Sequence, residues 1–209
     1  MAYSTSNPPQ CIAQGVMGKG KVWMYKSADA EATFDDTDYF TDALELGMQT
    51  GDVIAFQGNG LYSKAIQWWT RSPYSHVALV VRFDQLGVDR VFLLHALVEG
   101  GVVLMPASFY LSRASGAAEW VPLKHPLALL KRTSYLHDLF KFSMLQLGRS
   151  YDARGILKFL VPGVKESKAS YFCSELVSDA YKHIGLTERT FVSPGELLSW
   201  PIFETRRLL

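Results

Sequence analysis

The sequence predicts an α+β domain, in which a small and mainly antiparallel sheet of about five strands packs against helices. Short β-rich runs fill residues 51–123, apolar residues recur at helical spacing after residue 125, and no linker separates the two parts. Hydrophobic residues make up 48% of the 209-residue chain and charged residues 20%. These fractions are typical of a globular protein and exclude a mostly disordered one.

The first 50 residues are expected to form an N-terminal arm with peripheral elements, ahead of one domain over residues 51–209. The start of the arm contains Pro8-Pro9 and shows little periodicity, which indicates a loosely held segment. KVWMY at residues 21–25 is a strand candidate, and DTDYFTDALELG, ending at Gly47, is a candidate for a short helix.

The predicted strands of the domain follow one another closely. A short apolar strand at residues 51–58 is closed by glycines, and a helix follows in which four residues share one face: Leu61, Ala65, Trp68 and Trp69. The β-rich runs HVALVVRF (76–83) and RVFLLHALV (90–98) are separated by the turn-forming stretch DQLGVD. GVVLMP (101–106) and AEWVPL (118–123) are two further strands.

Two helices are predicted after the strands. The first covers residues 125–147 and ends at Gly148. The second is SYFCSELVSDAYKHIG, with Ser170 as the expected N-cap and Gly185 as its end. Its buried stripe is expected to consist of Leu176, Val177, Ala180, Tyr181 and Ile184.

The net charge and the number of cysteines exclude several classes of protein. Lys plus Arg number 21 against 20 Asp plus Glu, so the net charge of +1 gives no long-range field for nucleic acid or an anionic membrane, and no nucleic-acid partner is expected. The two cysteines, Cys11 and Cys173, exclude a disulfide scaffold and a four-cysteine zinc site. A single bridge between them stays arithmetically open, although a reduced compartment fits better.

The N-terminus lacks the basic start and apolar core of a secretory signal, and the longest apolar runs are far shorter than the roughly 20 residues that span a bilayer. We therefore expect a cytoplasmic protein without a transmembrane segment, unless it leaves by a route without a cleaved signal. A place in a virus particle is compatible with this expectation.

Cys173 is the candidate nucleophile, because it lies in the first turn of the second predicted helix. Free backbone N–H groups and the helix dipole favour an anion there, so this position is expected to lower the pKa of the thiol below its usual value of about 8.5. The alternative is that Cys173 is a small apolar residue on the buried stripe, since inert buried cysteines are common.

A thiol nucleophile needs a base, and two histidines lie unexpectedly within apolar strands. If the two β-rich runs pair as a hairpin centred between Gln85 and Leu86, His76 lies directly opposite His95, and the two imidazoles are neighbours on one face. A shift of that centre by two residues would instead pair His76 with Glu99, on the same face.

The same three side chains, Cys173, His76 and His95, also form a set of zinc ligands. They lie singly on distant elements, without the short-spaced pairs of a structural zinc site. We therefore expect no metal and no cofactor.

With these residues in place, the chain resembles the permuted branch of the NlpC-type papain-like hydrolases, often called YiiX-like. The resemblance covers about residues 50 to 185, and YFCSELV preceded by SHVALV carries most of it. The matching segments are GDVIAF (51–56), YSHVALVV (74–81), LLHALVEGGVVLMP (93–106), LGRSYDARGIL (147–157) and YFCSELVSDAY (171–181).

The resemblance implies a circularly permuted papain-like fold, with Cys173 as nucleophile and His76 as general base. The orienting residue falls in Leu94-His95-Ala96, where YiiX-like members usually have Glu and this chain has His95. Lecithin:retinol acyltransferase-like proteins and many NlpC-type peptidases use His in this role. Glu99 is the alternative orienting residue.

These roles imply a cysteine hydrolase that cleaves an amide bond, in a peptide or cell-wall peptide, through an acyl-enzyme. Alternatives are a thioester acyltransferase or lipid hydrolase, and a non-catalytic component of a larger assembly such as a virus particle. Trp68 and Tyr74 are expected to contact a peptide or acyl-bearing substrate, and residues 1–50 offer a surface for a protein partner.

Overall fold

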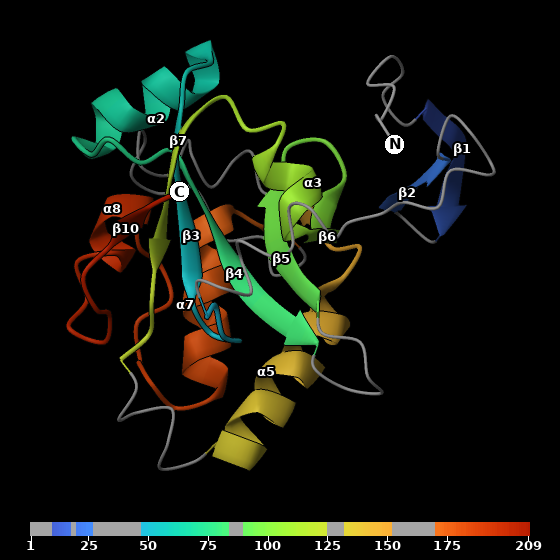
Figure 1. Ribbon diagram of the computed structural model, residues 1–209. Coiled ribbons are helices and arrows are strands. Elements are labelled where there is room, and N and C mark those ends of the chain that lie inside the picture. The colour runs from blue at the N-terminus through green and yellow to red at the C-terminus, as the bar shows by residue number, and fades with distance from the viewer. Residues whose placement is uncertain (1–9, 18–19, 27–46, 84–89, 125–131, 152–169) are drawn as a thin grey trace, which may run out of the picture.

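A six-stranded antiparallel sheet forms the centre of the computed structural model, in the order β10-β7-β3-β4-β5-β6 (Figure 1). The structure describes residues 10–17, 20–26, 47–83, 90–124, 132–151 and 170–209. The strands of the sheet are β3 (Val53–Gly58), β4 (His76–Phe83), β5 (Arg90–Leu97), β6 (Gly101–Pro106), β7 (Gly116–Val121) and β10 (Arg207–Leu208).

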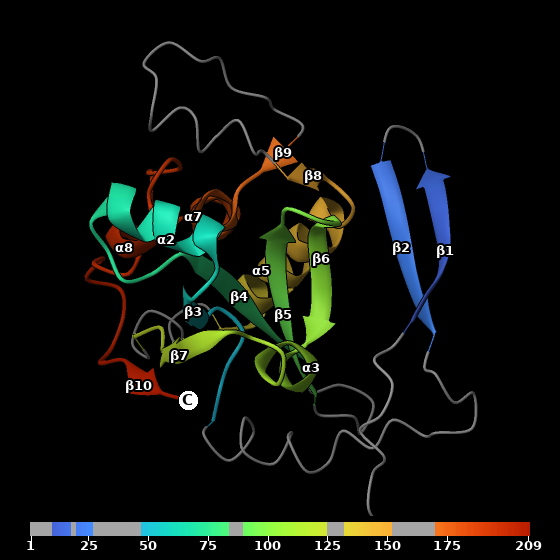
Figure 2. The same cartoon turned by 90° about the horizontal axis from the view of Figure 1, so that it is seen from above.

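The central strands are buried on both faces, so they appear in the sequence as continuous apolar runs rather than alternating ones. On one face, Val53, Val77 and Leu79 pack with the helices α5 (Arg132–Gln146) and α7 (Cys173–His183). On the other face, Ile54 and Val80 pack towards the short helix α3 (Ala107–Leu111). Figure 2 shows α5 and α7 on one side of the sheet and α3 on the other.

The helix α7 begins at Cys173, with Phe172 as an N-cap that makes no side-chain hydrogen bond. Ser170 is not the N-cap: it belongs to β9 (Ser170–Tyr171), which pairs in parallel with β8 (Ser150–Tyr151). The predicted end is confirmed, since Gly185 takes a φ of 73°. A left-handed residue after a helix is most easily supplied by glycine.

Two serines fix the first turns of α7 to the segment that follows it. The Ser174 hydroxyl donates to the Val192 carbonyl at 2.7 Å, and the Ser178 hydroxyl donates to the Thr190 carbonyl at 2.5 Å. Both serines are completely buried. Because Ser174 follows Cys173 directly, these bonds also hold the thiol in place.

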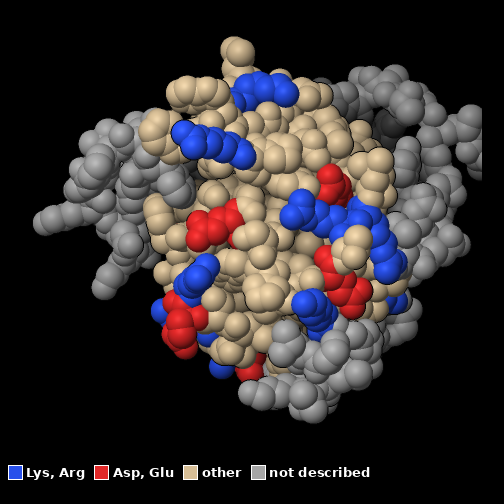
Figure 3. All heavy atoms as spheres, turned by 90° about the vertical axis from the view of Figure 1, so that its left-hand side faces the viewer, with Lys and Arg blue, Asp and Glu red and all other residues tan. Residues whose placement is uncertain are grey.

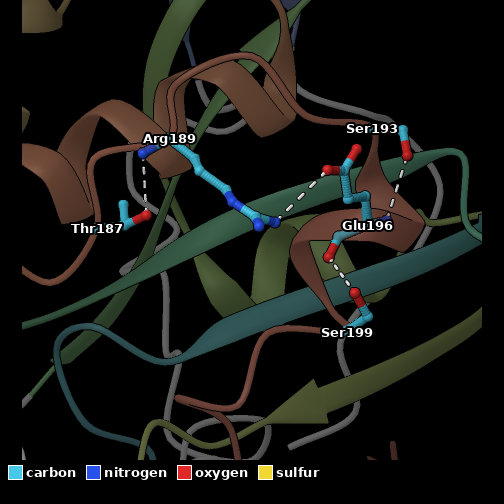
Figure 4. A network of polar contacts seen from close by, with 5 residues as sticks. All are labelled: Thr187, Arg189, Ser193, Glu196 and Ser199. Carbon is cyan, nitrogen blue, oxygen red and sulfur yellow. Dashed lines mark hydrogen bonds and ion pairs between the residues drawn. The ribbon is translucent and has the colours of Figure 1, made fainter.

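The segment after α7, whose carbonyls accept these two hydrogen bonds, is held by further polar contacts around α8 (Pro194–Leu197). Ser193 caps α8 by accepting a hydrogen bond from the Glu196 N–H, and the Ser199 hydroxyl donates to the Glu196 carbonyl (Figure 4). The Arg189 guanidinium lies 3.9 Å from the Glu196 carboxylate. This exposed pair adds little stability by itself, whereas the cap is worth about 1 kcal/mol.

The predicted α+β class and the five predicted strands of the sheet are confirmed. The sheet has a sixth strand, because β10 pairs with β7 at the chain's end. The helix α2 covers Leu61–Thr70, as expected. In the arm, the strand candidate is β2 (Gly20–Lys26), and it pairs with β1 (Gln10–Met17), which was not predicted.

Three predicted features lie outside the described residues: the short helix before Gly47, the turn at residues 84–89, and the first part of the helix from residue 125. Within the described part of the chain, no helix has both the length and the hydropathy needed to cross a bilayer.

Asp52 is a buried carboxylate that joins the turn before β3 to β7 and the residues directly after β7. Its oxygens accept hydrogen bonds from the Gln49 N–H, the Trp120 indole N–H and the Leu123 N–H, each at 2.9 Å. Burial raises the pKa of Asp52, and the three donors oppose that effect. The carboxylate therefore fixes the entry into β3 against β7.

Replacing Asp52 by Asn should lower the free energy of unfolding by about 1–3 kcal/mol, because the new amide N–H₂ would face backbone or indole donors. Urea denaturation at pH 7 measures this change. Asp138→Asn, on α5, is the matched control and should stay near wild type. Equal stability of the two variants would contradict the structural role of Asp52.

Candidate active site

The β4–β5 hairpin positions the two strand histidines. Its ladder pairs Leu79 with Leu94, whereas the predicted register would pair Leu79 with Phe92 and the alternative with Ala96. Both predicted registers were therefore wrong, and the true one lies midway between them. A shift of two residues keeps every side chain on its face, so His76 and His95 still share one face.

The two imidazoles lie in hydrogen-bond contact. His76 Nε2 is 3.3 Å from His95 Nδ1, and the ring centroids are 5.5 Å apart. His95 is completely buried, while His76 keeps part of its surface exposed. The expectation that the two rings are neighbours is therefore confirmed, although they meet diagonally across the strands.

Two aromatic rings surround this pair on the α3 side of the sheet. The Tyr110 ring, from α3, packs edge-on against His95 at 4.2 Å between centroids, and the Phe56 ring lies 5.6 Å from His76. Tyr110 was not singled out from the sequence. Tyr110 lies in α3, directly after β6, and no sequence pattern at that position indicates a site residue.

The thiol of Cys173 approaches the sheet from the other side, because α7 packs against β4 and β5 on the opposite face. The β4–β5 ladder ends at Leu79 and Leu94. Beyond that pair the strands diverge, as Figures 1 and 2 show, and the backbone N–H of Val77 donates to the Cys173 sulfur. The sulfur thus lies in the fork between the strands, at the residue after His76.

Burial decides the protonation state of this thiol. Cys173 is only 4% exposed, and burial raises its pKa to about 11, even though the N–H groups of Val77, Ser174 and Cys173 itself lower it. The expectation that the helix start lowers the pKa of Cys173 was wrong. Donors at a helix N-terminus favour the anion, but here the loss of hydration outweighs them.

The histidines are also neutral. Burial lowers the pKa of His76 to about 4, and burial together with the nearby His76 lowers the pKa of His95 well below its usual value. At neutral pH the resting site therefore holds a protonated thiol and two uncharged imidazoles. The thiolate–imidazolium pair is not the resting form.

A link between the two sides of the site comes from Tyr110. Burial raises the pKa of its phenol to about 12, and the negative charge of a Cys173 thiolate raises it further. The same phenol ring contacts His95 and lies 6.2 Å from the His76 ring. The sulfur, the phenol and the two imidazoles thus belong to one region of the molecule.

The other predicted site residues, Tyr74 and Trp68, make no hydrogen bond or ring contact with the thiol or with either imidazole of the site among the described residues. The Tyr74 hydroxyl donates to the Glu119 carboxylate at 2.7 Å and accepts from the Arg206 guanidinium at 2.7 Å. Trp68 is 77% exposed on α2, with its ring against Trp69. Their roles in substrate binding stay predictions, and that of Tyr74 would require its phenol to leave two partners.

Glu99, the alternative orienting residue, is exposed in the turn between β5 and β6, whereas His95 contacts His76. Cys173 is a free thiol, so the bridge to Cys11 is not formed. Among the described residues, no three His, Cys, Asp or Glu side chains are arranged to hold a metal ion.

The fold of the chain is papain-like. Residues 47–199 match the family of permuted papain-like amidases of the YaeF/YiiX type, the C92 peptidases, and the chain belongs to that family. The protein is therefore a cysteine hydrolase of the papain-like peptidase and amidase class. No curated protein matches the chain.

A solved structure supports the fold. It is described as the crystal structure of the metalloprotein YiiX from Escherichia coli O157:H7, and it is similar to this chain with a TM-score of 0.57 and 20% sequence identity. The alignment covers 76% of this chain and 96% of the other. At this identity, the likeness bears on the fold alone.

Alkylation with iodoacetamide tests the protonation state of the thiol. In a Cys11→Ser background, the rate for native Cys173 should be low at pH 7 and should rise roughly tenfold per pH unit to beyond pH 10, because only the thiolate reacts. In denaturant the rate should level off near about pH 9. A native rate that is already maximal at pH 7 would show a preformed ion pair and contradict the buried neutral thiol.

Proposed function

We propose that the protein cleaves amide bonds through a Cys173-His76-His95 site and an acyl-enzyme. The observation that carries this proposal is the 3.3 Å contact between His76 Nε2 and His95 Nδ1, next to the strand residue whose N–H contacts the sulfur. A nucleophile, a base and an orienting group are the parts that covalent catalysis needs.

The contact between the imidazoles determines which nitrogen acts as the base. If His76 donates its Nε2 proton to His95 Nδ1, then His76 Nδ1 is unprotonated and free to accept a proton. His95 then carries its own proton on Nε2, a buried atom without a hydrogen-bond partner among the described residues. His95 is the orienting residue in this arrangement, and it fixes the tautomer of His76.

The reaction then proceeds by addition and elimination. The Cys173 sulfur attacks the carbonyl carbon while its proton passes to His76 Nδ1, and the backbone N–H of Cys173 stabilises the oxyanion. The C–N bond breaks as the imidazolium gives that proton to the leaving amine. Water, deprotonated by His76, attacks the thioester and releases the acid and the thiol.

Burial has a defined role in this scheme. Because the resting thiol and imidazole are neutral, charges form only as the sulfur attacks, in a region walled by Tyr110 and Phe56. Donors that act on a developing anion in a region with little water stabilise it more than they would in water.

A peptide or cell-wall peptide is the proposed substrate. A thioester or lipid acyl group is the alternative.

Intact-mass analysis of the full chain after exposure to a cell-wall peptide, and separately to a short-chain thioester, tests this function. The Cys11→Ser protein should gain the mass of the acyl group on Cys173, and His76→Ala should not. An adduct from the thioester alone would favour the acyltransferase alternative. If neither compound gives an adduct or is turned over, the proposed catalysis is contradicted and a binding role in a larger assembly is supported.

The pH dependence of kcat/KM tests the role of His95. The acid limb should lie near pH 4, the pKa to which burial lowers His76. In His95→Glu a neighbouring negative charge favours the imidazolium, so the limb should move up, towards or beyond about 6.5. The neutral variant His95→Gln should keep the limb near its wild-type position. Identical limbs in all three proteins would contradict a contact between residue 95 and the base.

A further inference from the structure

We propose that α2 is a docking surface for an anionic lipid bilayer, a property separate from the hydrolase activity. Most of the apolar side chains of the helix are exposed, and only Ile66 among the large ones is half-buried. Leu61 is 92% and Trp68 77% exposed, and no residue of α2 is buried. Tyr62 and Trp69 are exposed as well. The four residues that the sequence places on one face, Leu61, Ala65, Trp68 and Trp69, are therefore all exposed.

The inner side of α2 is held by polar contacts. The Gln67 side-chain amide donates to the Gly58 carbonyl at 3.0 Å, and the Ser63 side chain lies against Gly58. The Thr70 hydroxyl donates to the Ile66 carbonyl within the helix. A surface helix normally buries its apolar face, so the inverted arrangement of α2 does not contribute to the core. Exposed apolar patches of this kind mark interaction sites.

The chemistry of the exposed face suits a bilayer surface. Trp and Tyr concentrate at membrane interfaces, because one part of each ring system is apolar and another part donates hydrogen bonds. The exposed cations Lys64 and Arg71 flank the patch, and the segment Leu61–Arg71 contains no acidic residue. In Figure 3, the uppermost part of the surface, where α2 lies, shows blue among tan and no red.

This local pattern is compatible with a net charge of only +1. Two cations attract anionic headgroups within a screening length of about 8 Å, and this local attraction does not need a large net charge on the whole chain. The helix has ten residues, about half the number that spans a bilayer. It would therefore lie along the membrane interface with its aromatic side towards the lipid. Binding then depends mainly on the Trp pair and secondarily on charge.

Docking through α2 would also bring the catalytic region close to the membrane. Five residues separate the end of α2 from His76, the first residue of β4. A substrate presented at the bilayer surface would then meet the site without diffusing far. The docking itself requires neither Cys173 nor His76.

Co-sedimentation of the full chain with vesicles tests the proposal. The protein should bind vesicles of equal parts phosphatidylcholine and phosphatidylserine more tightly than vesicles of phosphatidylcholine alone. The double variant Trp68→Ser/Trp69→Ser should lose more than about tenfold in affinity, since two aromatic side chains leave the interface. Lys64→Gln should lose roughly fivefold. Circular dichroism checks that each variant is folded.

Matched controls come from another helix of the same chain. On α5, Leu145 and Lys141 are also exposed, and Leu145→Ser and Lys141→Gln should bind as wild type does. Absence of binding to the anionic vesicles would overturn the proposal, and so would wild-type binding by the double Trp variant. A dimer on size-exclusion chromatography that the double variant abolishes would assign the surface to a second copy of the chain instead.

Discussion

The structure depends on the point where β4 and β5 stop pairing. Their ladder ends at Leu79 and Leu94, and beyond it the Val77 N–H donates to the sulfur of Cys173. A sheet that stayed fully paired would separate the thiol on the α7 face from the two histidines on the α3 face. Opening the hairpin by a few residues gives the sulfur a donor, and the buried serines of α7 hold it there.

Burial then sets the chemistry. It raises the pKa of Cys173 to about 11 and lowers that of His76 to about 4, so neither group is charged before a substrate arrives. In the proposed mechanism His95 takes the orienting position in place of the carboxylate usual in YiiX-like proteins, and this would leave the imidazolium less stabilised. The proposed mechanism would therefore rely on donors already in place, above all the N–H groups at the start of α7, rather than on a standing ion pair.

Much of this could be predicted from the sequence, and the failures have physical causes. His76 and His95 were placed on one face correctly because any even shift in register conserves the face, while the register itself depends on a turn that the hydrophobic pattern does not determine. The pKa of Cys173 was predicted in the wrong direction, because the position in a helix is visible in the sequence and the depth of burial is not. Tyr110 was missed because α3 comes close to the histidines only through tertiary packing. Helical spacing identified the apolar face of α2 but could not tell whether it faces the core.

The proposed catalysis requires the Cys173 sulfur and the His76 imidazole to meet, and 1,3-dibromoacetone, which alkylates a thiol and then a nitrogen within reach, tests this directly. Treatment of the Cys11→Ser protein, followed by peptide mass spectrometry, should give one acetone bridge between Cys173 and His76, with the loss of two bromides, and none after His76→Ala. If Cys173 is alkylated at one end only, or is bridged to a residue outside the fork, the thiol and the base do not meet and the catalytic site described above does not exist.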